Sequence, residues 1–118
     1  DTTVARGRQI VGKPDSPDQA LAMLQGLQGQ THRVLTYVAV GTLSRQQHCL
    51  QVSTVTMAPV TTSRLRTYVS TGEPMGKAGA YAIQEWIGVV GIKRVEGDFY
   101  NVMGLPVSRV MQALQTML

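Results

Sequence analysis

The order of apolar and polar positions along the chain predicts short strands and amphipathic helices in alternation. Residues 2–5 and 8–11 alternate around Arg6-Gly7, a pattern typical of a short β-hairpin with glycine in its turn. Ser16 then precedes a proline and an acid, and leucines follow at helical spacing. We therefore expect a capped helix over residues 17–28.

The middle of the chain is rich in β-branched residues. Residues 31–57 alternate around a polar turn at 44–47, which predicts two antiparallel strands. Pro59 ends the second strand, and Thr61 or Thr62 could cap a short helix. The inward-facing residues of that helix would be Leu65, Tyr68 and Val69.

The last third of the chain again mixes the two patterns. Residues 87–95 are β-rich with two interrupting glycines, which favours a buried strand, and residues 98–101 are expected to form a loop. A bend at Gly104-Leu105-Pro106 precedes a helix over residues 108–118, with Val110, Met111 and Leu114 on one face. The alternation indicates an α/β fold with a mixed sheet.

Size and composition fit one domain over residues 1–118. No apolar run approaches the roughly 18 residues of a membrane span, and no signal-peptide pattern is present, so a cytoplasmic protein is expected. Since the chain opens at Asp1 without a methionine and runs at once into a strand-like segment, we expect a domain truncated at its N-terminus.

The charge balance points to an anionic partner. Eleven Lys and Arg residues against seven Asp and Glu give a formal charge of +4, which suits nucleic acid or a small phosphate compound. The basic residues are scattered, and one Trp, four Tyr and one Phe form no stacking platform. A small phosphate compound is therefore favoured over a nucleic acid polymer.

Several common catalytic patterns lack their residues. The chain has no Ser/His/Asp set, no Cys/His pair and no phosphate-binding loop of the GxxxxGK[ST] type. His32 and His48 have no cysteine or acid at ligand spacing, so hydrogen-bonded histidines are favoured over zinc ligands. Cys49 lies in a β-like apolar run, where an inert thiol is expected.

The stretch 71–84 is the most constrained polar part of the sequence. It combines three glycines and a proline with Glu73, Lys77 and Gln84. Composition alone leaves two interpretations open, a structural turn or a place where a ligand meets the main chain. Together with Lys13 near the first hairpin, these polar groups are those that phosphoryl chemistry requires.

Several motifs in order resemble the Maf family of nucleoside triphosphate pyrophosphatases. They are Asp1-Thr2, Gly12-Lys13-Pro14, the run from Gly72 to Gln84, Glu96-Gly97, Asn101-Val102 and Gly104-Leu105-Pro106. The resemblance covers essentially the whole chain, and the combination is far more specific than any one motif. It implies an elongated mixed sheet flanked by helices, with a cleft between two lobes, as in inosine triphosphate pyrophosphatases.

The resemblance also implies an activity and a set of site residues. The expected reaction is hydrolysis of a nucleoside triphosphate to the monophosphate and pyrophosphate, with Mg²⁺ or Mn²⁺. Asp1 matches the family's proton acceptor and would bind the metal, while Lys13 and Lys77 match its phosphate-side lysines. Thr2 and Gln84 match positions that distinguish subfamilies, and this pair is similar to the branch that acts on dTTP and UTP.

Two further expectations concern substrate contacts and assembly. Gln84 offers a donor and an acceptor, which suits the edge of uracil or thymine, and Glu73 is a further candidate for substrate binding. Family members resemble dimers, so the C-terminal helix could serve in a homodimer. A non-catalytic module that binds an anion or a protein partner is the alternative function, supported by the positive charge.

Overall fold

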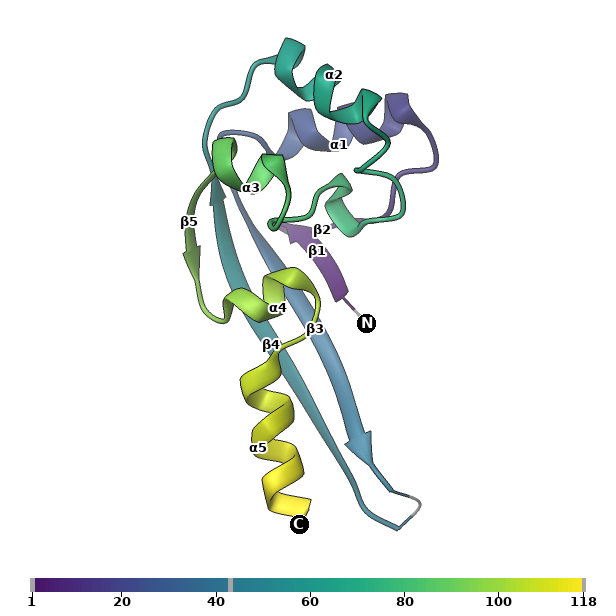
Figure 1. Ribbon diagram of the computed structural model, residues 1–118, viewed down its shortest axis with the longest axis vertical. Coiled ribbons are helices and arrows are strands. Elements are labelled where there is room, and N and C mark those ends of the chain that lie inside the picture. Colours follow the sequence, from purple (N-terminus) through teal and green to yellow (C-terminus); the bar gives the residue numbers. More distant parts are fainter. Residues whose placement is uncertain (1, 43, 118) are drawn as a thin grey trace.

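The computed structural model describes residues 2–42 and 44–117 and shows an elongated molecule, with extents of 51 × 27 × 26 Å. A five-stranded sheet runs along its length in the order β2-β1-β3-β4-β5 (Figure 1). The strands are β1 (Thr2–Arg6), β2 (Gln9–Val11), β3 (Thr31–Gly41), β4 (Gln46–Met57) and β5 (Ile92–Glu96). The predicted α/β class and the elongated sheet with flanking helices are confirmed.

The strand directions correct one detail of that expectation. All four pairings among the described strands are antiparallel, whereas the sequence analysis predicted a mixed sheet. One reason is that β1 with β2, and β3 with β4, follow one another in sequence and form hairpins, whose short turns reverse the direction of the chain. Both hairpins lie where the alternating pattern predicted them.

Helices cover the sheet in two groups (Figure 1). One end carries α1 (Pro17–Leu27), α2 (Thr62–Ser70), the 3₁₀ turn η1 (Ala78–Ala80) and α3 (Trp86–Val90), and the long hairpin carries α4 (Phe99–Met103) and α5 (Val107–Met117). The hydrophobic core lies mainly in the first group. Its largest buried side chains include Leu24, Leu27, Met57, Leu65, Tyr68 and Ile87.

Both predicted helix starts are confirmed at their caps. The Ser16 hydroxyl accepts a hydrogen bond from the Gln19 backbone N–H, and Thr61 does the same for Arg64. Each cap satisfies an amide that the first helical turn leaves without a partner. The three predicted inward residues of α2 are all buried.

The segment 87–95 differs from its prediction. Residues 86–90 form the short helix α3, and only residues 92–96 form a strand, β5, which lies at the edge of the sheet and is partly exposed. Gly88 explains the difference, since its backbone packs directly against the carbonyl oxygen of Ile83 and turns the chain there. This close backbone contact within one turn has overridden the strand preference of the β-branched residues.

The expected loop at 98–101 is instead the start of a helix. The Asp98 side chain caps α4 by accepting a hydrogen bond from the Tyr100 backbone N–H. Asn101 is fully buried, and its amide nitrogen lies 3.1 Å from the Val34 carbonyl and 3.0 Å from the Ser53 hydroxyl. This amide ties α4 to both β3 and β4.

The C-terminal helix α5 packs beside the long hairpin through a smaller face than expected. Ala113 is buried and Val110 partly so, whereas Met111 and Leu114 remain 50% and 40% exposed. The predicted apolar face is therefore divided between the sheet and the surface. Among the described residues, no helix is long and apolar enough to span a bilayer.

Candidate functional site

A pocket of about 330 Å³ lies where the first hairpin, the 71–84 stretch and α4 meet. Its polar lining comes from β1, from the loop after β2 and from the stretch that follows α2. The lining residues with polar side chains are Thr2, Lys13, Lys77, Tyr81 and Gln84. Segments far apart in the sequence thus bring their polar groups to one cavity.

A backbone hydrogen bond brings the two lysines to this pocket. The Gly79 N–H donates to the Gly12 carbonyl at 3.0 Å, so the loop that carries Lys13 lies against the stretch that carries Lys77. Gly79 has a φ of 71°, and a Cβ there would approach the Val4 side chain to 3.1 Å. Glycine is favoured at this crossing because a side chain would be strained at this φ and would crowd Val4.

Lys77 is held in place by an acid that sequence analysis did not single out. Its ammonium forms an ion pair with Glu85, and the Tyr68 hydroxyl donates to the same carboxylate oxygen at 3.4 Å. Partial burial opposes the ionisation of Glu85, but hydrogen bonds from Lys77 and Glu73 outweigh it and lower its pKa. Glu85 is therefore a carboxylate at neutral pH.

Glu73 lies beside this ion pair and outside the lining of the main pocket. It lines a smaller cavity of about 230 Å³ together with Tyr68 and Trp86. A hydrogen bond to the Glu85 carboxylate is the main reason why the pKa of Glu73 is raised above its ordinary value. Glu73 is thus placed to touch Glu85 and not the space that the lysines face.

Thr2 and Gln84 lie on the lining as the sequence suggested. The Thr2 hydroxyl is 3.0 Å from the Thr36 hydroxyl and donates to the Gly104 carbonyl at 3.3 Å, which joins β1 to the end of α4. Gln84 is exposed at the pocket rim. Its amide is accessible to a ligand.

A buried histidine fixes the segment between Lys77 and Gln84. His32 on β3 is 2% exposed, and its Nε2 lies 2.6 Å from the Tyr81 hydroxyl, with the two rings edge to face. Burial lowers the pKa of His32 to about 4, because a charged imidazolium would lose its water there. The neutral His32 and Tyr81 therefore anchor the pocket wall to the sheet.

This burial predicts a pH dependence of stability. The unfolded chain binds a proton at His32 below about pH 6.5 and the folded chain only below about pH 4, so stability is complete above pH 6.5 and falls as the pH drops towards 4. The free energy of unfolding should decrease by about 2 kcal/mol between pH 7 and pH 5. Urea titrations at several pH values measure it.

The chain's second histidine provides the control for that experiment. His48 is exposed and hydrogen-bonded to Tyr37, so His48→Gln should keep the pH slope of the wild type. His32→Gln should be less stable at pH 7 but should lose most of the slope between pH 7 and pH 5. An unchanged slope in His32→Gln would assign the pH dependence to other groups.

The metal expected from the resemblance has little support in the described residues. Asp1, the expected proton acceptor and metal ligand, lies outside the described residues. In the described part of the chain, no group of three or more His, Cys, Asp or Glu could hold a metal ion, and no carboxylate lines the main pocket. The described residues alone therefore provide no metal site.

The site therefore contains more contributing residues than the sequence indicated. The structure brings Thr2, Lys13, Lys77 and Gln84 to one pocket, places Glu73 beside it, and leaves Asp1 undescribed. Sequence reasoning missed Glu85, His32 and Tyr81 as contributors. The only signal for Glu85 was an acid directly after the polar stretch, and the two aromatic partners are 49 residues apart, so no local pattern could pair them.

Comparison with known proteins places the chain in a family. The chain matches the family described as "Maf-like protein" over residues 1–117, and it belongs to that family. A protein of Polaromonas sp. is 50% identical over 106 residues, covering 90% of this chain and 52% of that protein. Proteins of Cytophaga hutchinsonii and Bacillus velezensis are each 40% identical, over 99% and 98% of this chain and 54% and 60% of their own lengths.

All three relatives carry the name dTTP/UTP pyrophosphatase. The chain spans about half the length of the curated relatives that it matches. The matched half contains the pocket and both of its lysines.

Proposed function

We propose that this chain acts in the hydrolysis of dTTP and UTP, and of modified pyrimidine nucleotides, to the monophosphate and pyrophosphate. The observation that supports this most is the meeting of two lysines, Lys13 and Lys77, with the Gln84 amide in one pocket. Ammonium groups suit phosphate oxygens, and an amide suits a base edge. The names of the relatives agree with this substrate class.

Some residues of the pocket would bind the phosphates of the nucleotide, and another would bind its base. Lys13 and Lys77 would neutralise charge that moves onto the leaving pyrophosphate, which lowers the barrier by electrostatic stabilisation. Gln84 would read the base. Positioning and electrostatics would supply most of the acceleration, since phosphoryl transfer needs little covalent help from a protein.

A divalent cation, Mg²⁺ or Mn²⁺, and Asp1 as proton acceptor complete the proposal. The cation would add positive charge at the phosphates, and Asp1 together with phosphate oxygens would bind it. We also expect a cytoplasmic location, where nucleoside triphosphates are found, and a homodimer. The half-exposed Met111 and Leu114 of α5 offer an apolar face for that contact.

The test is pyrophosphate release from UTP, dTTP, dCTP and 7-methyl-GTP, with Mn²⁺ and with a chelator. It should be run on this chain and on a protein of the relatives' full length. We expect release from UTP and dTTP that the chelator abolishes. The alternative, a non-catalytic module that binds anions or a partner, is favoured by the formal charge of +4 and would be supported by nucleotide binding without release.

Gln84→Ala tests the base-reading role in the same assay. Removing the amide leaves the donor and acceptor of the base without partners, so the preference for UTP over dCTP should fall by about 10-fold. Gln112→Ala on α5, outside the lining of the pocket, is the control and should keep the preference. Unchanged discrimination in Gln84→Ala would refute the role.

A further inference from the structure

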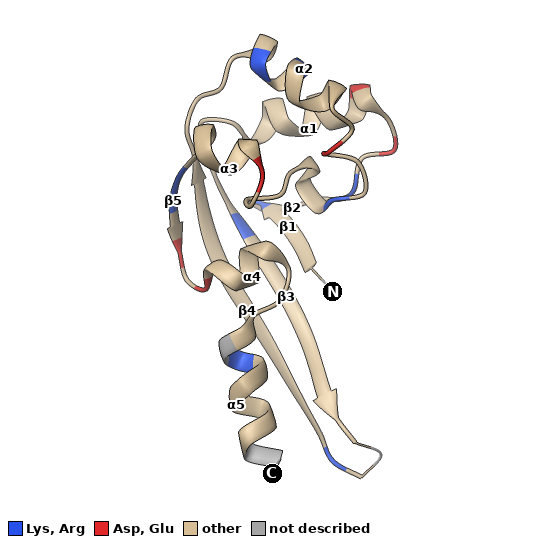
Figure 2. Cartoon of the chain, viewed as in Figure 1, with Lys and Arg blue, Asp and Glu red and all other residues tan. Residues whose placement is uncertain are grey.

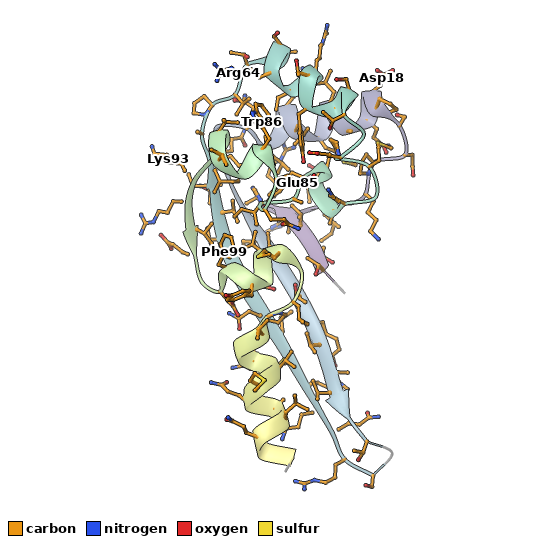
Figure 3. The ribbon with its side chains drawn as sticks, viewed as in Figure 1. Asp18, Arg64, Glu85, Trp86, Lys93 and Phe99 are labelled. Atoms are coloured by element: carbon orange, nitrogen blue, oxygen red, sulfur yellow. The ribbon has the colours of Figure 1, made fainter. Side chains whose placement is uncertain are left out.

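The ion pair between Lys77 and Glu85 joins a pocket residue to one that lies behind it. Lys77 lines the main pocket, whereas Glu85 does not, and the side chains are 34% and 18% exposed. Figure 3 shows Glu85 in the loop that enters α3, directed into the space between α3 and the 71–84 stretch. The carboxylate therefore contacts the ammonium without itself lining the cavity.

We propose that Glu85 is a positioning residue that fixes the Lys77 ammonium at the pocket wall, where it meets the phosphate oxygens of the substrate. This inference rests on the proposed function. A lysine side chain has a flexible four-carbon stem, so without a partner its ammonium samples many positions. An ammonium has three donors, and one bond to Glu85 leaves two for phosphate.

Glu85 can do this because it is itself held firmly. The Tyr68 hydroxyl donates to the carboxylate oxygen that accepts from Lys77, and Tyr68 is a core residue of α2 that is 2% exposed. The main chain of Glu85 is also fixed, since its N–H donates to the Ala82 carbonyl at 3.1 Å and its carbonyl accepts from Gly88 at 2.9 Å. The Lys77 ammonium is thus connected through one carboxylate to the core.

The charges around the pair favour positioning over attraction as its role. Glu73 and Tyr68 are the titratable groups that face Glu85 besides Lys77, so the ammonium stands beside two carboxyl groups, which weaken its long-range attraction for an anion but leave its short-range contact with a bound phosphate. By contrast, no described carboxylate lies within ion-pair distance of Lys13. Lys13 would attract the triphosphate, and Lys77 would orient it.

Steady-state kinetics with UTP separate these roles. Loss of position should slow the chemical step, so Glu85→Ala should lower kcat by about 10-fold while KM stays within about 2-fold. Glu85→Gln keeps an oxygen acceptor at the same place and should recover most of kcat. Glu96→Gln, which breaks the exposed ion pair with Arg94 on β5, is the matched control and should leave both constants unchanged.

A second measurement needs no turnover. The Lys77 ammonium should give a slowly exchanging NMR signal in the wild type that shifts on addition of inorganic tripolyphosphate, and Glu85→Ala should lose it. A folded Glu85→Ala with unchanged kcat, or with lower KM at unchanged kcat, would overturn the inference, since Glu85 would then only neutralise charge. If Glu85→Ala does not fold, the inference is tested by the kcat of Glu85→Gln and by the NMR signal of the wild type. The absence of a slowly exchanging Lys77 signal from the wild type would overturn the inference.

The outcomes also separate this inference from the proposed function. A wild-type protein that releases no pyrophosphate from any nucleotide contradicts the function, and the NMR signal still reports whether Lys77 is held. Turnover in the wild type together with no effect of Glu85→Ala contradicts the positioning role alone.

Discussion

Lys77→Met should lower the rate of pyrophosphate release from UTP by about 10²–10³-fold, which is the usual cost of removing one donor to a developing negative charge. Methionine keeps most of the apolar stem, so the loss is mainly that of the ammonium. Lys77 lines the pocket and has Glu85 as a carboxylate partner. Loss of its ammonium would also leave Glu85 and Glu73 side by side without a neighbouring cation. Its removal should therefore affect kcat more than KM.

The chain offers a matched control for this substitution. Lys93 lies on the edge strand β5, is exposed and points away from the molecule (Figure 3). Lys93→Met removes the same charge from the protein, yet it should leave the rate within about 2-fold. Equal losses in the two variants would mean that total charge matters and the pocket does not.

The charge distribution explains why the place of a lysine should matter. Figure 2 shows most charged residues in the part of the chain around α1, α2, α3 and β5, whereas the long hairpin and α5 carry few. Acids and bases are mixed in that part, so they form no large basic surface. A cation must therefore act on a bound anion at short range.

Gly88→Ala should be the most destabilising small substitution, with a loss of about 4 kcal/mol or more in the free energy of unfolding. A Cβ at this position would lie 1.6 Å from the Ile83 carbonyl oxygen. The oxygen belongs to the main chain and the Cβ is bonded directly to it, so neither atom can move independently of the backbone. The strain cannot be relieved by a side-chain rotation, so the turn from Ile83 to Gly88 would have to open. That turn carries Gln84 and Glu85, and activity should fall with stability.

Urea denaturation of Gly88→Ala beside Gly12→Ala measures this effect. A Cβ added at Gly12 would meet no atom within 4 Å, and the φ of Gly12 is not positive, so alanine there should change stability by less than about 1 kcal/mol. Similar stability of the two variants would show that the close approach of Gly88 to Ile83 is not required by the fold.

Elements with complete local signals were predicted correctly from the sequence. The helix at 17–27 has its cap, its proline and its apolar spacing within a dozen residues, and the hairpins have alternation on both sides of a turn. In the segment 87–95 the strand was predicted correctly from residue 92 onward, but residues 87–90 form a helix, because the close approach of the Gly88 and Ile83 backbones leaves no signal in strand preference. A mixed sheet was wrong for a related reason, since strand direction depends on the whole path of the chain.

At the site, too, some residues could be predicted from the sequence and others could not. The resemblance to the Maf family singled out Thr2, Lys13, Lys77 and Gln84, and all four line one pocket. Glu85 and the pair of His32 with Tyr81 support that pocket through side-chain contacts. Such contacts leave no periodic signal in the sequence, so only the folded chain reveals them.

The hydrogen bond between Thr2 and Gly104 spans 102 positions of the sequence and has a consequence for the order of events during folding. One wall of the pocket is near the start of the chain and another is near its end, so a growing polypeptide has no pocket until α4 has docked. The Asn101 amide holds α4 in that docked position, because it joins α4 to β3 and β4 together. Brief detachment of α4 would open the pocket while the sheet stays intact, and ligand binding would in turn slow amide exchange in α4.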